Sequence, residues 1–122
     1  LHEDCGLLAW SPLTRGIISG KYLNGARPEG ARITMETRPE HRLGEQLDLA
    51  TEKYIALAKR YDLDPCQMAL AFVNSRPFVS STLIGATTME QLRSNIDSIS
   101  LTLSDEVLKE IHLIRRAHPM PF

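Results

Sequence analysis

Two short apolar runs constrain the fold of this chain more than any other feature. They are Cys5–Trp10 and Val79–Ile84, each bounded by polar or turn-forming residues. Runs of this kind are typical of strands that are buried on both faces of a sheet. The segment between them has a helical pattern, and two strands joined by a helical crossover run parallel. We therefore predict an α/β fold with a parallel sheet.

The number of strands limits what the chain can form alone. A strand buried on both faces needs neighbours on both sides, and independent stability takes three or more strands. At 122 residues the chain is long enough for one domain or for part of one. We expect a segment of a larger protein that supplies further strands. A small, self-contained α+β domain is the alternative.

Composition and charge exclude several classes of protein. Hydrophobic residues make up 43% and charged residues 24% of the chain, and the formal net charge is −1. These values are ordinary for a globular protein and provide no basic field to attract nucleic acids. No apolar run approaches the roughly 20 residues of a membrane-spanning helix, and no signal-peptide pattern is present. We expect a cytoplasmic protein without nucleic-acid or membrane partners.

Four helices follow from apolar periodicity and from capping residues. They are predicted at 45–61, at 65–75, from Thr87 or Thr88 onward, and after Ser104. Asp64 supplies the N-cap of the second helix, with Pro65 at its first position and Gln67 at the third, as in a capping box. The buried face of the third helix is expected to carry its apolar side chains, Leu92, Ile96 and Ile99.

The segments after the first strand are less regular. A short helix is predicted at Thr14–Tyr22, weakened by two glycines. Residues 24–44 contain three glycines, two prolines and four arginines and show no periodicity, so we predict a long loop. Loops of this length are usually functional lids or mobile. We expect little apolar burial to hold it down, and poor order without a ligand.

Two places in the sequence are candidates for ligand binding, because each follows a predicted strand. In parallel α/β proteins, ligands bind beyond the carboxyl ends of the strands. The first place runs from Trp10 to Lys21, whose ammonium group can reach a phosphate. The second runs from Gly85 to Asn95, where a helix start favours an anion and glycine permits close approach. The alternatives are a solvated lysine at the first place and simple helix capping at the second.

Groups for acid–base or metal chemistry are scattered. The four histidines have neither metal-ligand spacing nor an evident carboxylate partner: His2, His41, His112 and His118. Cys66 falls in the first turn of a helix, where a thiolate is favoured, but no histidine is placed to act as its base. With only one further cysteine, Cys5, neither a disulfide framework nor a metal site is expected. We predict no catalytic residues and no metal ligands in this chain.

The two candidate places carry a family resemblance. Residues 9–13 (AWSPL), with Gly16 and residues 19–23 (SGKYL), resemble the seventh strand and following loop of aldo-keto reductases. Residues 83–96 (LIGATTMEQLRSNI) resemble the eighth strand of that family and the helix after it. Residues 21–32 and 64–73 are similar to the Tas-type branch, and potassium-channel β subunits are more distant. The resemblance covers essentially the whole chain.

The resemblance implies a fold and an activity. The family is a (β/α)8 TIM barrel that binds NADP(H) and transfers hydride to a carbonyl of a small molecule. Residues 1–122 would be the C-terminal part of one such barrel domain, with its last two strands and with 24–44 as a long loop. The catalytic Asp, Tyr, Lys and His of the family lie in the first half of the barrel. The chain would therefore be inactive alone, and unpaired strand edges would favour its self-association.

The resemblance also implies cofactor contacts at named residues. Those along the nicotinamide ribose and the pyrophosphate would be Trp10, Ser11, Pro12 and Leu13. Lys21 would meet a phosphate, and Arg32 would close over the cofactor from the loop. Those that hold the adenosine 2′-phosphate and the adenine would be Gly85, Thr87, Gln91, Ser94 and Asn95. The alternative is a non-catalytic module that binds a cofactor or a partner.

Overall fold

The computed structural model describes residues 5–36 and 43–119. Five α-helices, two strands and three short 3₁₀ segments follow one another in this described part: β1 (Leu7–Trp10), η1 (Thr14–Ser19), η2 (Leu23–Gly25), α1 (Arg32–Met35), α2 (Glu45–Arg60), α3 (Pro65–Asn74), β2 (Val79–Leu83), α4 (Met89–Asp97), η3 (Ser98–Ser100) and α5 (Asp105–Ala117). The chain is thus an α/β structure, as predicted. No helix among these residues is both long and apolar enough to cross a membrane.

The two strands pair in parallel, which confirms the arrangement predicted from the helical crossover. Leu7 lies opposite Val79 and Trp10 opposite Leu83, with an irregularity in register after Leu7. Within the described ranges these two strands are the whole sheet. Because they are parallel neighbours, their carboxyl ends lie at the same edge.

Burial of the strands differs from the prediction. Leu7, Leu8 and Trp10 are 50%, 61% and 75% exposed, and Leu83 is also exposed. Each strand has only the other as a neighbour, and in the described part of the chain α3 packs against β2. The expected burial on both faces is therefore wrong for this chain by itself.

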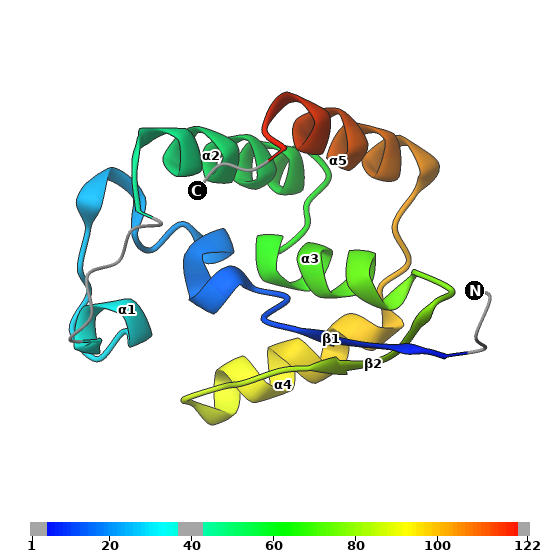
Figure 1. Cartoon of the computed structure of the whole chain (residues 1–122), viewed down its shortest axis with the longest axis horizontal. Coiled ribbons are helices and arrows are strands. Elements are labelled where there is room, and N and C mark those ends of the chain that lie inside the picture. The colour runs from blue at the N-terminus through cyan, green and yellow to red at the C-terminus, as the bar shows by residue number, and fades with distance from the viewer. Residues whose placement is uncertain (1–4, 37–42, 120–122) are drawn as a thin grey trace.

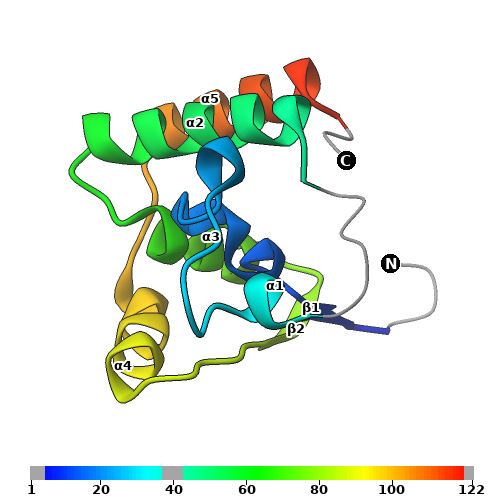
Figure 2. The same ribbon diagram turned by 90° about the vertical axis from the view of Figure 1, so that its left-hand side faces the viewer.

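The larger core lies between helices rather than on the sheet. In Figures 1 and 2, α2 and α5 run side by side on one side of α3, and the strands and α4 lie on the other side. The cluster at the α2–α3–α5 junction is made of Leu57, Ala58, Met68, Ala71, Leu103, Val107 and Ile111. Burying one such leucine or methionine side chain contributes about 1.5–3 kcal/mol.

A second cluster corrects the expectation for the 24–44 loop. Ile33 is 1% exposed and packs with Tyr22, Ile17 and Leu47, so apolar burial does fix this part of the loop. The backbone N–H of Ile33 also donates to the Tyr22 hydroxyl at 3.1 Å. Residues 24–36 contain η2 and α1 rather than irregular chain throughout. The rest of the predicted loop, at 37–42, lies outside the described residues.

The predicted short helix after β1 is a kinked pair of turns. Arg15 and Gly16 have φ values of 60° and 90°, which interrupt η1. Gly20 ends it at a φ of 81°, and a Cβ atom there would come within 2.5 Å of the Ile55 side chain. The left-handed backbone therefore favours glycine at this turn, and a side chain there would also force Ile55 Cδ1 to shift.

The longer helices confirm their predicted starts. Asp64 caps α3, Thr88 caps α4 and Ser104 caps α5, each through a side-chain oxygen that accepts backbone N–H bonds. These caps are local interactions, which is why the sequence alone reveals them.

The predicted buried face of α4 is wrong. Ile96 is 56% exposed and Ile99, just beyond the helix, is 77% exposed, whereas Leu92 is half-buried. The side of this segment that is covered carries Asn95 and Ser98 instead. This polar side packs against α3, whose first turn is also polar, and the apolar side that the periodicity predicted to be buried does not.

Candidate functional site

The sheet brings the two predicted ligand-binding places together. Trp10 pairs with Leu83 at the ends of β1 and β2, so residues 11–13 and 85–88 leave the sheet at one edge. Ser11 has a φ of 54°, and its carbonyl accepts the backbone N–H of Thr14 at 2.9 Å. The chain thus turns sharply as soon as β1 ends. This edge is where parallel α/β proteins bind their ligands.

The first place presents an indole and an ammonium group. Trp10 and Ser11 are exposed, whereas Pro12 and Leu13 are half-buried. Lys21 is half-buried, with Nζ 5.3 Å from the centroid of the Tyr22 ring. A Cβ atom on Gly16 would lie 3.1 Å from Lys21 Nζ. The absence of a side chain at Gly16 therefore leaves space for the Lys21 side chain beside η1.

The second place is organised by two threonines with different roles. Thr88 caps α4, and its hydroxyl accepts the backbone N–H of Gln91 at 3.2 Å. Gln91 Oε1 in turn accepts the backbone N–H and the hydroxyl of Thr87, both at 3.0 Å. Capping is thus the role of Thr88, and Thr87 is tied to Gln91. Gly85 is exposed, with open space where a Cβ atom would lie.

The first turn of α3 lies between these two places. Gln67 Nε2 lies 3.0 Å from the Ser94 carbonyl oxygen and 3.3 Å from Ser94 Oγ. Burial and the nearby Asp64 carboxylate raise the pKa of Cys66 to about 11, and the Lys21 ammonium opposes this increase. Lys21 and Ser94 thus both approach the start of α3. The expectation that the helix start favours a Cys66 thiolate is wrong, because burial dominates.

The capping-box role predicted for Gln67 from the sequence is wrong. A capping-box side chain would bond back to the start of its own helix, but this one reaches α4. The signal for a different role is Asp64, which caps the helix alone by accepting two backbone N–H bonds at 2.9 Å. Asn95, also nominated, is 8% exposed and lies on the same side of α4.

Arg32 lies apart from the other nominated residues, on α1. Its Nε is 3.4 Å from Glu36 Oε1, and its side chain is 62% exposed. Glu36 Oε2 is 2.5 Å from Arg15 Nη2, and both of those side chains are 24% exposed. The carboxylate of Glu36 therefore links α1 to the turn after β1 and holds the Arg32 guanidinium at the surface.

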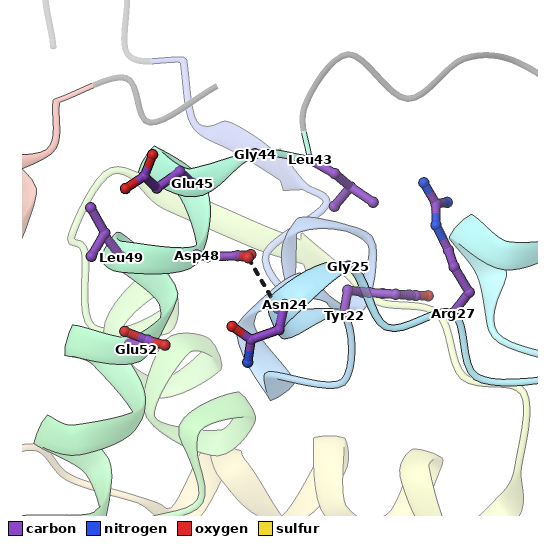
Figure 3. Close-up of a pocket in the computed structure, with 10 residues that line it drawn as sticks. All are labelled: Tyr22, Asn24, Gly25, Arg27, Leu43, Gly44, Glu45, Asp48, Leu49 and Glu52. Carbon is purple, nitrogen blue, oxygen red and sulfur yellow. Dashed lines mark hydrogen bonds between the residues drawn. The ribbon is translucent and has the colours of Figure 1, made fainter.

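The structure contains a separate cavity that does not coincide with this edge. A volume of about 430 Å³ opens between η2 and the first turns of α2. Three carboxylates line it, and Asp48 accepts the backbone N–H of Asn24 at 3.1 Å (Figure 3). None of the eleven residues nominated from the sequence is among its lining residues. Its lining carries these three carboxylates against one guanidinium, that of Arg27, and this balance disfavours an anionic ligand such as a phosphate.

Metal chemistry finds no support in the described ranges. Among residues 5–36 and 43–119, no group of three or more His, Cys, Asp or Glu side chains could hold a metal ion. His2 and His41 lie outside these ranges. The arrangement that remains is a pair of polar loops and a helix start at the carboxyl edge of a parallel sheet, which is where α/β proteins of this class bind ligands.

Comparison with known proteins gives the family. The sequence model of the Aldo/keto reductase family matches residues 1–116. The chain belongs to the aldo/keto reductase family of oxidoreductases, which confirms the resemblance found at the two motifs.

Several curated relatives cover nearly all of this chain. Protein tas of Escherichia coli K12 is 51% identical over 120 residues, covering 98% of this chain and 35% of the relative. A putative voltage-gated potassium channel subunit beta of Schizosaccharomyces pombe is 34% identical over 94% of this chain and 35% of its own length. L-glyceraldehyde 3-phosphate reductase of Escherichia coli O157:H7 is 33% identical over 90% of this chain and 33% of its own length. The chain spans about a third of the length of these relatives.

Proposed function

We propose that this chain is the C-terminal, NADP(H)-binding part of a (β/α)8 barrel that reduces a small-molecule carbonyl. One observation carries the proposal. The two segments that resemble the cofactor motifs of the family, far apart in sequence, leave neighbouring parallel strands at one edge of the sheet. The proposal places the protein in the cytoplasm.

The exposed apolar surface supports the barrel. Leu8 on β1 and Ile99 after α4 are 61% and 77% exposed, although both belong to residue types that are usually buried. In a closed barrel, further strands would flank β1 and β2, and further helices would cover the outside. The greater length of the relatives supplies enough chain for both. Without that cover, we expect these surfaces to drive self-association of residues 1–122.

The residues at the edge fit a dinucleotide phosphate. The α4 start directs free backbone N–H groups outward and favours negative charge. The side-chain nitrogen of Gln91 remains a donor, because its oxygen is the atom that holds Thr87. Lys21 adds a positive charge in the segment after the other strand, and the exposed Trp10 ring offers an apolar face. When bound, the reduced nicotinamide would supply the hydride.

Two tyrosines of this chain, Tyr54 and Tyr22, are poorly suited to give the proton for carbonyl reduction. Burial raises the pKa of Tyr54, which lies in the helical layer on α2, and Tyr22 is buried with its hydroxyl accepting a backbone bond. The proposal therefore assigns acid–base catalysis to the remainder of the protein. The same observation favours the second candidate, a cofactor-binding module without catalysis.

Binding of the two reduced cofactors to the intact protein tests the proposal. Lys21→Met should weaken NADPH binding, measured by calorimetric titration, because it removes the cation expected to meet a phosphate. Lys59→Met, at an exposed position on α2, is the matched control and should leave binding unchanged. Failure of the intact protein to bind either nucleotide would contradict the proposal. Binding without carbonyl reduction would favour the second candidate.

A further inference from the structure

Gln67 makes a contact that helix capping does not explain. Asp64 Oδ1 accepts the backbone N–H groups of Cys66 and Gln67, both at 2.9 Å, so α3 is capped without the glutamine side chain. That side chain reaches across to α4, where its Nε2 approaches both the carbonyl oxygen and the hydroxyl of Ser94. The two residues are 27 positions apart in the chain.

The chemistry of the Ser94 carbonyl fixes the direction of these hydrogen bonds. A carbonyl oxygen only accepts, so the amide atom 3.0 Å from it must be the nitrogen. The same nitrogen lies 3.3 Å from Ser94 Oγ, and it has no lone pair with which to accept. Ser94 Oγ therefore accepts from Gln67, and the hydroxyl proton of Ser94 points elsewhere.

That proton has no acceptor within residues 5–36 and 43–119. A helical serine often donates to the carbonyl four residues earlier, but the side-chain bond of Ser94 in this part of the chain is the one that its Oγ accepts from Gln67 Nε2. Ser94 is half-buried, so its hydroxyl is not sealed inside the core. It lies three residues after Gln91, on the neighbouring turn of the same face of α4. A ligand at the α4 start would meet a hydroxyl that is already set to donate.

We propose that Gln67 is a positioning residue that fixes the Ser94 hydroxyl as a hydrogen-bond donor toward an acceptor atom of the bound nucleotide. The inference rests on the proposed function, because it takes the ligand at α4 to be a nucleotide. The acceptor is a purine ring nitrogen or a phosphate oxygen, both of which lack protons to donate at neutral pH. Gln67 itself does not touch the ligand.

A double-mutant cycle in the intact protein separates this role from a structural one. Gln67→Glu keeps the shape but places a carboxylate opposite Ser94, which draws the hydroxyl proton away from the ligand. Gln67→Met removes the amide without adding charge, and serves where the glutamate variant does not fold. Each is combined with Ser94→Ala, and Kd is measured for NADP⁺, NAD⁺ and adenosine 2′,5′-bisphosphate. Gln46→Glu, an exposed glutamine on α2, controls for the added charge.

The expected result is coupling between the two positions. Gln67→Glu should weaken NADP⁺ binding about fivefold to tenfold, and Ser94→Ala should weaken it by a similar factor. In the Ser94→Ala background, either substitution of Gln67 should have no further effect. Equal losses for NADP⁺ and NAD⁺ identify a purine acceptor, whereas a loss confined to NADP⁺ and the bisphosphate identifies the 2′-phosphate. Gln46→Glu should leave all three Kd values unchanged.

Additivity would overturn the inference. If Gln67→Glu and Gln67→Met weaken binding by the same factor with and without the Ser94 hydroxyl, Gln67 acts through the fold or through charge. Thermal unfolding of the ligand-free variants provides the readout of such a structural effect. Failure of the unmodified intact protein to bind any of the three nucleotides would overturn the proposed function first, and this inference with it.

Discussion

The two sides of α3 differ in how much of their apolar surface is buried. On the side of α2 and α5, Leu57, Met68 and Val107 are each at most 2% exposed. On the side of the strands and α4, Leu8 and Ile99 are 61% and 77% exposed. The difference teaches that, within the described residues, the α2–α3–α5 junction forms a buried core, whereas the sheet side leaves large apolar side chains exposed.

Matched truncations on the two sides should give the largest effect. Leu57→Ala removes a fully buried side chain and should cost about 2–5 kcal/mol of unfolding free energy in the intact protein. Leu8→Ala in the intact protein should cost a comparable amount, because the proposed barrel buries that strand. In the 122-residue chain alone, held dilute enough to stay monomeric so that Leu8 is exposed, the same substitution should stay within about 0.5 kcal/mol.

Urea unfolding followed by circular dichroism measures both variants in both contexts. The difference between the two sides of α3 is confirmed if Leu8→Ala lowers the unfolding free energy only in the intact protein. A Leu8→Ala cost near zero in the intact protein would show that β1 remains uncovered there and would contradict the barrel.

At the α4 start, Gln91→Glu tests whether the edge selects NADPH. The carboxylate keeps the acceptor atoms that hold Thr87, but it loses the amide donor and adds negative charge. We expect a loss of roughly 1–3 kcal/mol in NADPH binding and a smaller loss for NADH. Fluorescence titration of the intact variant gives both values. Equal weakening of the two cofactors would mean that this residue does not meet the 2′-phosphate.

The distance along the chain between interacting residues explains which features could be predicted from the sequence. Asp64, Thr88 and Ser104 act on backbone groups two or three residues away, so short motifs predict them. The parallel pairing and the site edge follow from two strands and a crossover. Ile33 is different, because one buried isoleucine in a polar segment leaves no periodicity to detect.

Long-range contacts account for the remaining errors. The Gln67–Ser94 bonds join segments 27 residues apart, and a capping position suggested a local role instead. Ile96 fits the apolar pattern of its helix but is 56% exposed, because α4 packs against α3 on the side that carries Asn95. The family motifs nominated residues for cofactor binding, which stays a prediction, but the contacts of these residues with one another depend on how α3 packs between the two strand ends.

Cys66, in the first turn of α3, is expected to have a smaller effect, on the pH dependence of stability. Its thiol is protonated in the fold up to about pH 11, because burial and the Asp64 carboxylate raise its pKa from 9.0. The unfolded chain loses this proton first, so stability should be constant below about pH 9 and fall between pH 9 and 11. Unfolding free energies of the intact protein and of Cys66→Ala across this interval isolate the effect from that of Tyr54. An identical pH dependence for both would contradict it.

Hydrogen exchange of the intact protein with and without NADP⁺, resolved by peptide, tests the central claim most directly. If the cofactor binds at the carboxyl edge, bound NADP⁺ should slow exchange at residues 10–23 and 85–95 and leave α5 unchanged. These two segments meet at one edge of the sheet, so their protection should appear together. Protection confined to residues 43–52, around the acidic cavity, or absent from both strand ends, would contradict the account.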